Sequence, residues 1–405
     1  MQCYICGSAA PIRVMSLGDQ PPSDAFLRPE DLNKPEAKYP LDLFFCETCS
    51  LVQLGFAVDP DVLFRDYVYN TGTNNSLRAN FKALVEGIIP RFGLAKGDFV
   101  IDVGSNDGTL LENYIPHGIN VLGIDPSSST SLAKERGIPT FVDYFNEETA
   151  KKVLAEYGKA KVITGTNVFA HVVELDSFMR GIVELLDEKG VFISENGYVV
   201  DMVEGLQYDS IYHEHLRYYS VTALAALFER FDMEMIDIER IPSHGGSIRV
   251  YAAKKHSFPV SESVAALLSM EKEKGYTHKE AYLKFAKDVA DTRTKLCEII
   301  SSLKRDGARI VGIGAPAKGN TLLNYCGLDA KIIDYLAEKS ELKIGRYSPG
   351  MHIPVVDEAR LFEEQPEAAI LLSWNLAEEL KKKLREKGYR GTFIVPNPVP
   401  RLLPD

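Results

Sequence analysis

The residues with the clearest catalytic potential lie in the segment IYHEHLRYYS (residues 211–220). It places Tyr212, His213, Glu214 and His215 at four consecutive positions. A phenol, a carboxyl and two imidazoles together suit proton transfer near neutral pH, because imidazole titrates in that range. We therefore predict general acid–base chemistry here. The alternatives are a solvated loop or a metal site, although no third ligand lies nearby in sequence. His171 is either a further member of this site or a packed histidine.

A second motif, VIDVGSNDGTLL (residues 100–111), predicts a strand, a turn from Gly104 to Gly108 and then a helix. Glycines at such a turn let the backbone approach a ligand at the edge of a parallel sheet. The Gly-x-x-x-Gly spacing differs from that of dinucleotide sites, so it favours S-adenosylmethionine, which has no pyrophosphate, over NAD. Asp125 ends the next strand and is suited to ribose hydroxyls, while Tyr144 and Phe145 are placed to flank an adenine. The predicted cofactor-binding residues are Asp102, Gly104, Ser105, Asn106, Asp107, Gly108, Asp125, Pro126, Tyr144, Phe145 and Asn167.

A second glycine-rich loop lies in RIVGIGAPAKGNTLLNYCGL (residues 309–328). Exposed N–H groups at a helix start, next to the Lys318 ammonium, form an anion site that would fit a diphosphate. The alternative is a nucleotide-binding type of fold that holds no ligand. The predicted substrate-binding residues are Ala317, Lys318, Gly319, Trp374 and Asn375, with Tyr67 and Tyr69 of YVYNTG as candidates to cover the site.

Four cysteines form two Cys-x-x-Cys pairs about 40 residues apart, Cys3 with Cys6 and Cys46 with Cys49. Four thiolates close a tetrahedral Zn²⁺ site and leave no open position, which is typical of structural zinc. The alternative is buried or redox-active thiols. Cys297 and Cys326 lack this spacing and are expected in the core.

Strands that alternate with helical patterns must position these motifs. Beyond residue 99 they predict two α/β layers with parallel sheets, one on each side of long helices in residues 261–305. We expect a hairpin at 41–56, an antiparallel pair at 233–241 and 247–254, and a strand KIIDYL at 331–336. The predicted fold class is α/β, with a zinc-binding domain (1–75), a Rossmann-like S-adenosylmethionine domain (76–260) and a second Rossmann-like domain (261–405) that contains the predicted diphosphate site.

The bulk composition is that of an ordinary enzyme of 405 residues, 45% hydrophobic and 25% charged. The formal net charge of −11 disfavours nucleic acid as a partner. We expect no signal peptide and no membrane span, hence a cytoplasmic protein with reduced thiols.

In these motifs and their order, the chain resembles the sugar C-methyltransferases of deoxysugar pathways, such as those of tetronitrose biosynthesis. NVFAHV, HGGSIRVY and YSPGMHIPV add to the resemblance, which covers the whole chain. It implies a zinc domain, S-adenosylmethionine as cofactor and a nucleoside-diphosphate 4-keto-6-deoxy sugar, usually dTDP-linked, between the last two domains. We also expect a monomer. Tyr212, Glu214, His215 and His171 fall on the family's catalytic positions, and either Tyr67 or Tyr69 matches a further active-site tyrosine.

The resulting hypothesis is methylation at the carbon next to the ketone. His215 would remove the proton, Tyr212 or His171 would donate a hydrogen bond to the oxyanion, and Glu214 would orient an imidazole. Three alternatives are an O- or N-methyltransferase, a non-catalytic zinc-ribbon protein and an NAD-dependent enzyme using the second glycine-rich loop.

Overall fold

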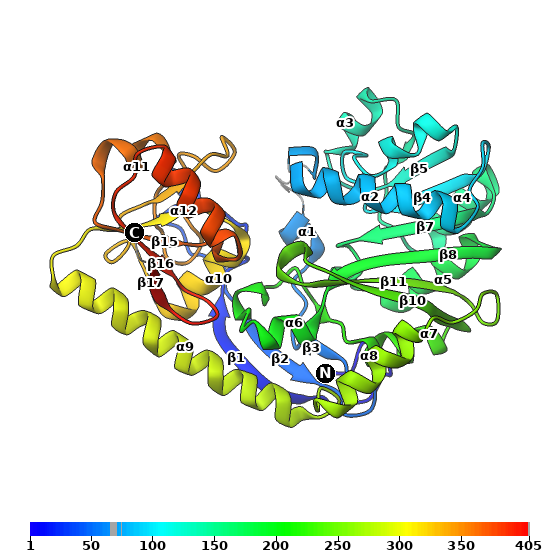
Figure 1. Cartoon of the computed structure of the whole chain (residues 1–405), viewed down its shortest axis with the longest axis horizontal. Helices are drawn as coiled ribbons and strands as arrows, with labels where there is room; N and C mark the ends of the chain where they lie inside the picture. The colour runs from blue at the N-terminus through cyan, green and yellow to red at the C-terminus, as the bar shows by residue number, and fades with distance from the viewer. Residues whose placement is uncertain (65–70, 74, 404–405) are drawn as a thin grey trace.

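The computed structural model describes residues 1–64, 71–73 and 75–403. Three sheets organise the chain, and the N-terminal one lies between the other two (Figure 1). The α/β class is confirmed. No helix among the described residues is long and apolar enough to cross a membrane.

The N-terminal sheet is small and antiparallel, with the strand order β1-β2-β3-β9. The expected hairpin is present as β2 and β3, and Cys46 and Cys49 lie at its turn. Its fourth strand, β9, comes from far along the chain and directly follows the segment Tyr212–His215. The elements are β1 (Ile12–Gln20), β2 (Tyr39–Phe45), β3 (Val52–Leu54), β9 (Arg217–Tyr218) and helix α1 (Pro60–Phe64).

The central sheet has the order β10-β11-β8-β7-β4-β5-β6, parallel from β8 to β6 and antiparallel at the β10–β11 edge. The antiparallel pair has the predicted bounds. The strands of the central sheet are β4 (Phe99–Val103), β5 (Asn120–Ile124), β6 (Thr140–Phe141), β7 (Ala160–Thr166), β8 (Leu186–Gly197), β10 (Met233–Ile241) and β11 (Ser247–Lys254). The helices are α2 (Asn75–Arg91), α3 (Thr130–Glu135), α4 (Glu147–Tyr157), α5 (Leu175–Leu185), α6 (Val199–Glu204) and α7 (Val221–Glu229).

The helix predicted after Gly108 is wrong. Two short 3₁₀ turns, Leu111–Asn113 and Ile115–His117, take its place. Pro116 lacks a backbone N–H and Gly118 adopts a left-handed conformation (φ 69°), so an α-helix cannot continue through this stretch.

The C-terminal sheet has the order β14-β13-β12-β15-β16-β17, with β17 the antiparallel edge strand. The predicted strand KIIDYL is largely wrong, because β13 begins only at its last residue, Leu336. The strands of the C-terminal sheet are β12 (Ile310–Ile313), β13 (Leu336–Glu338), β14 (Val355–Asp357), β15 (Ala368–Leu371), β16 (Thr392–Val395) and β17 (Arg401–Leu403). The helices are α10 (Ala317–Cys326), α11 (Ala359–Glu364) and α12 (Ala377–Glu386).

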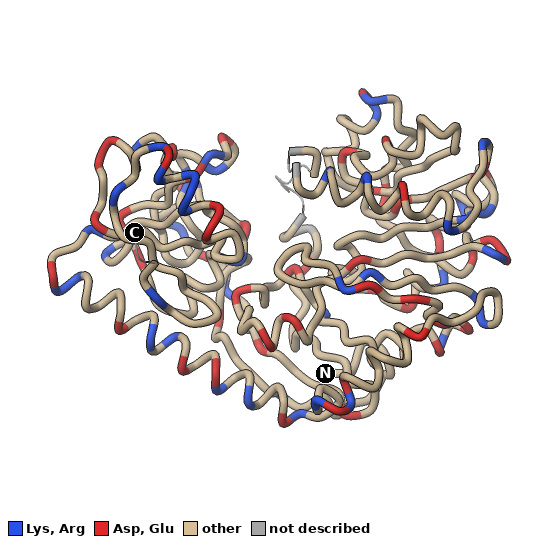
Figure 2. Tube along the Cα trace, in the orientation of Figure 1, with Lys and Arg blue, Asp and Glu red and all other residues tan. Residues whose placement is uncertain are grey.

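Two helices connect the larger sheets, as predicted: α8 (Glu262–Glu273) and α9 (Lys279–Arg305). The buried Glu271 of α8 accepts hydrogen bonds from the Tyr198 hydroxyl (2.7 Å) and the Val221 amide (2.6 Å), so α8 is held to the central domain. Helix α9 packs on β1 and then reaches the C-terminal domain (Figure 1). Both charge signs alternate along it (Figure 2), for example in the i,i+4 pairs Lys284–Asp288 and Lys287–Asp291.

The N-terminal domain also contacts the C-terminal domain directly. Leu27 and Tyr347 form an antiparallel backbone bridge, and the Asn320 side chain donates to the Ser23 carbonyl (2.7 Å). The Glu36 carboxylate accepts from the Gly350 amide (2.9 Å). The small domain therefore joins the two large domains to each other.

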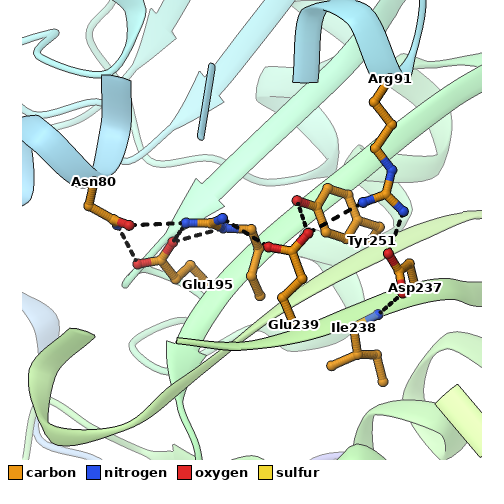
Figure 3. A network of polar contacts seen from close by, with 8 residues as sticks. Asn80, Arg91, Glu195, Asp237, Ile238, Glu239 and Tyr251 are labelled. Atoms are coloured by element: carbon orange, nitrogen blue, oxygen red, sulfur yellow. Dashed lines mark hydrogen bonds and ion pairs between the residues drawn. The ribbon is translucent and has the colours of Figure 1, made fainter. Parts of the chain in front are cut away.

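A polar network holds α2 against the antiparallel edge of the central sheet (Figure 3). Glu195 at the end of β8 is fully buried and pairs with Arg249 (3.1 Å), while Asn80 of α2 donates to Glu195 (3.0 Å). Arg249 also reaches Glu239 (3.1 Å), which in turn contacts Arg91 of α2 (3.4 Å). Helix α2 is thereby held to this edge both at Asn80 and at its last residue, Arg91.

Candidate active site

The segment Tyr212–His215 runs between the 3₁₀ turn Tyr208–Ser210 and β9. On one side, Tyr218 of β9 pairs with Val52 of β3. On the other, the Leu216 amide donates to the carbonyl of Ala170 (3.0 Å), next to His171. The structure therefore brings His171 to the same place as Tyr212 and His215.

The hydrogen bonds of His215 define its tautomer. Its Nδ1 lies 3.1 Å from the Ser210 carbonyl oxygen, which can only accept, so Nδ1 carries the proton. Its Nε2 lies 3.0 Å from the Tyr212 hydroxyl, which then donates to the lone pair of this nitrogen. His215 is thus a neutral imidazole with a basic nitrogen facing a phenol.

The second imidazole, His171, lies edge-on to His215 with ring centroids 4.9 Å apart. Burial lowers the pKa of His171 to about 4, opposed by backbone hydrogen bonds to Glu214 and Asn167. Burial lowers the pKa of His215 to about 3, and the neighbouring His171 lowers it further. Both rings are therefore neutral at neutral pH.

Glu214 is only 4% exposed and lies near the N- and C-terminal domains. Burial raises its pKa well above the ordinary value; Asp24 adds to this effect and Lys343 opposes it. Within the described ranges no hydrogen bond joins its carboxyl to either imidazole, so Ser210 and Tyr212 orient His215 instead. His213 donates to the Tyr39 carbonyl (3.2 Å) and packs edge-on against its ring, which is a structural role.

The cofactor loop uses its glycines as predicted. Gly104 and Gly108 have φ of 71° and 77°, in the left-handed region. A Cβ on Gly104 would lie 2.1 Å from Val168, in the loop that leads to His171. The turn thus packs against the loop before His171 as closely as a glycine allows.

Polar groups of the loop also bind the protein itself. Asn106 and Asp107 accept hydrogen bonds from the amides of Thr71 (3.0 Å) and Gly72 (2.8 Å), which end the YVYNTG segment. Tyr67 and Tyr69 of that segment lie outside the described residues. Asp125, which follows β5, accepts a hydrogen bond from the Asn106 amide (2.9 Å) and so stabilises the turn between Gly104 and Gly108.

The other predicted cofactor residues have mixed surroundings. Asp102 is buried next to Thr164 (2.5 Å), and burial raises its pKa to about 7. Phe145 packs against Phe178 (ring centroids 5.0 Å apart), whereas Tyr144 is 45% exposed. Of the remaining residues, Ser105 is buried, Pro126 is exposed and Asn167 has a left-handed backbone (φ 57°).

At the second glycine-rich loop, α10 begins at Ala317 and Gly319 packs against Leu372. Lys318 donates to Asn375 (2.5 Å), and its ammonium lies 5.1 Å from the centre of the Trp374 ring. These three predicted substrate residues are therefore neighbours.

Asp209, which the sequence did not indicate, completes this group. It is fully buried and accepts from the Trp374 indole (2.6 Å) and the Asn397 amide (3.2 Å). Burial lowers the pKa of Lys318, and the charge of Asp209 opposes that shift. Asp209 immediately precedes Ser210, the acceptor for His215, so the two halves of the site share one short turn.

The four N-terminal cysteines satisfy the requirements of a zinc ion. Their Sγ atoms all lie within 4.8 Å of one another, with Cys3–Cys49 at 3.4 Å and Cys6–Cys46 at 3.6 Å. A tetrahedral ZnS₄ centre with bonds of about 2.3 Å has sulfur–sulfur edges of roughly 3.8 Å. Four thiolates leave the metal no open position, so the zinc is structural.

Comparison with known proteins gives the family. The chain is 33% identical to the C-methyltransferase NovU of Streptomyces niveus over 407 residues, which is 99% of this chain and 96% of that protein. It belongs to the C-methyltransferase family. Family models match a zinc binding domain at residues 3–64, a methyltransferase domain at 77–238 and a C-methyltransferase C-terminal domain at 242–398.

Similar solved structures include an S-adenosylmethionine-dependent methyltransferase from Clostridium acetobutylicum (14% identity, TM-score 0.35, 44% of this chain and 92% of that chain). Another is magnesium protoporphyrin IX methyltransferase from Synechocystis with bound S-adenosylhomocysteine (14% identity, TM-score 0.34, 44% and 83%). The NovU match and the three family models make the protein an S-adenosylmethionine-dependent C-methyltransferase with a zinc-binding domain. When bound, the cofactor supplies an electrophilic methyl group.

Replacing one zinc ligand tests the structural role of the metal. We expect Cys49→Ser to lose bound zinc and several kcal/mol of unfolding free energy, because metal binding contributes to folding. Zinc content by mass spectrometry and thermal unfolding measure both effects. Cys297→Ser is the matched control and should keep its zinc. Retained zinc in Cys49→Ser would contradict this assignment.

Asp209→Ala leaves the half-buried Trp374 indole and the buried Asn397 amide without their acceptor, at a cost of roughly 1–3 kcal/mol for the fully buried amide. Trp374 is the single tryptophan of the chain, so its fluorescence reports this change directly. We expect a red-shifted emission and reduced stability, with neither effect in the exposed neighbour variant Glu378→Ala. An unchanged spectrum would show that Asp209 does not hold Trp374.

The depressed histidine pKa values predict a pH dependence of stability. In the unfolded chain His171 and His215 titrate near 6.5, about the ordinary value, but in the folded protein only near 4 and 3. Between these values the unfolded state binds more protons, so stability is full above pH 6.5 and falls on acidification. Melting temperatures from pH 7.5 to 4.5 should therefore decline less steeply in the double variant His171→Asn/His215→Asn than in the wild type. Parallel curves would contradict the assignment.

Proposed function

We propose that this C-methyltransferase methylates the carbon next to the ketone, C-3, of a nucleoside-diphosphate 4-keto-6-deoxy sugar. The observation that carries the proposal is the neutral His215 imidazole, with Nε2 3.0 Å from the Tyr212 hydroxyl and Nδ1 bound to Ser210. A base and a hydrogen-bond donor side by side are what enolisation of a ketone requires.

In the proposed reaction the substrate replaces the contact between Tyr212 and His215. The imidazole nitrogen then faces the acidic C–H bond, and the phenol, or His171, donates to the ketone oxygen. As the proton moves to His215, negative charge develops on that oxygen. This negative charge stabilises the adjacent His215 imidazolium. It therefore offsets the low basicity that burial gives His215 when no substrate is bound.

The resulting enolate carbon would accept the methyl group that S-adenosylmethionine, bound at the turn from Gly104 to Gly108, would supply, with S-adenosylhomocysteine as the leaving group. His215 afterwards returns its proton to solvent. The protein's own contribution is to hold the two proton-transfer groups beside the cofactor turn at Gly104.

A nucleotide-linked acceptor, dTDP-linked in the first instance, is supported by the second half of the site. Lys318 at the start of α10 supplies a positive charge, and Trp374 and Asn375 lie next to it. We assign the recognition of the diphosphate to this loop, within a C-terminal domain that comprises residues 261–405. The named activity of NovU supports carbon, rather than oxygen or nitrogen, as the acceptor.

The test is deuterium exchange of the substrate's α-proton in heavy water, followed by NMR with a panel of dTDP-, GDP- and CDP-linked 4-keto-6-deoxy sugars. We expect exchange and methyl transfer in the wild type and neither in His215→Asn, whereas the exposed variant His117→Asn keeps both. Exchange that persists in His215→Asn would remove His215 as the base. Methyl transfer without exchange in the wild type would favour an O- or N-methyltransferase.

A further inference from the structure

The turn between β10 and β11 carries an exposed histidine in a disfavoured conformation. His244 has φ 52° and ψ 21°, in the left-handed region, and its side chain is exposed. The turn lies at the end of the central sheet that faces the C-terminal domain (Figure 1). A non-glycine residue adopts this conformation only where its surroundings impose it, and such positions cluster at functional sites.

Several hydrogen bonds impose the conformation of this turn. The Gly246 amide and the Ser247 hydroxyl both donate to the Ser243 carbonyl (2.9 and 3.0 Å). The Gln207 side chain donates to the Gly245 carbonyl (2.7 Å), and the Tyr198 amide donates to the Gly246 carbonyl (3.2 Å). The turn is thus held rigidly, and His244 is presented from it.

The same short segment that holds this turn also holds both halves of the active site. Gln207 binds the His244 turn, Asp209 binds Trp374, and the Ser210 carbonyl accepts from His215. Three neighbouring positions therefore place His244 close to the proton-transfer group and to the residues around Lys318.

Electrostatics agree with this placement. Desolvation by the surrounding protein and the charge of Lys318 lower the pKa of His244. His244 in turn contributes to the lowered pKa of His215. His244 therefore lies close enough to both groups to interact with them electrostatically, although they belong to different domains.

We propose that His244 is a further substrate-binding residue, whose imidazole donates a hydrogen bond to the sugar-bearing phosphate or to the oxygen that links it to the sugar. This inference rests on the proposed function. In a nucleotide-linked sugar, those atoms lie between the carbon that His215 would deprotonate and the diphosphate that Lys318 would meet. An imidazole that interacts with both residues is therefore placed to meet that part of the substrate.

The substitution His244→Gly removes the imidazole without straining the backbone, so it separates an effect on ligand binding from an effect on folding. Glycine adopts left-handed conformations without penalty, so His244→Gly should unfold at the same or a higher temperature than the wild type. His256→Gly is the matched control, because His256 is an exposed histidine with φ 64° on the opposite end of β11. His244→Asn tolerates the same backbone and keeps one donor.

The measurement is calorimetric binding of dTDP-glucose and of dTMP, with S-adenosylhomocysteine present. We expect His244→Gly to weaken dTDP-glucose binding by roughly tenfold or more, the loss of one hydrogen bond to a charged group. Binding of dTMP, which lacks the sugar-bearing phosphate, should be unchanged. His244→Asn should recover part of the affinity, and His256→Gly should bind both ligands like the wild type.

Three results would overturn the inference in distinguishable ways. If His244→Gly binds dTDP-glucose normally while Lys318→Ala binds it weakly, His244 is a turn residue and the proposed function stands. If His244→Gly weakens both ligands equally, the turn acts on the fold of the site rather than on the phosphate. If the wild type binds neither ligand, the nucleotide-linked acceptor fails, and the inference with it.

Discussion

The pairing of β3 with β9 is the contact on which the rest of the site depends. The two residues of β9, Arg217 and Tyr218, extend a sheet whose turn is held by the zinc cysteines, and only Leu216 separates them from His215. The zinc domain therefore determines where the segment Tyr212–His215 leaves the central domain. Four thiolates leave its metal no position for a substrate, yet the position of His215 depends on the fold that the metal stabilises.

Buried polar groups add to a continuous apolar core in connecting the parts of the active site. Asp209 joins the segment before Tyr212 to Trp374 and Asn397 of the C-terminal domain, and Asp24 pairs with Lys343 (3.3 Å) near Glu214. Such contacts are directional, and leaving one partner unpaired in a buried site is costly. They therefore set orientation as well as proximity, which proton transfer requires.

The sequence predicted the features that depend on local spacing. The zinc cysteines, the left-handed glycines at 104 and 108 and the exact bounds of β10 and β11 are of this kind. It did not predict contacts such as Asp209–Trp374, because no local pattern links two residues that are 165 positions apart. The helix expected after Gly108 and the strand at 331–335 failed for a related reason: apolar periodicity alone does not exclude turns.

The small domain makes a second connection between the two large domains, parallel to α9. A 27-residue helix is about 40 Å long and stiff, and a single such linker would still permit rotation at its ends. The Leu27–Tyr347 bridge and the Asn320–Ser23 hydrogen bond join the C-terminal domain to the N-terminal domain at a second place, which restricts this rotation. Part of the entropic cost of orienting the central and C-terminal domains is thus met during folding rather than in each turnover. The angle between these domains is therefore a property of the native state.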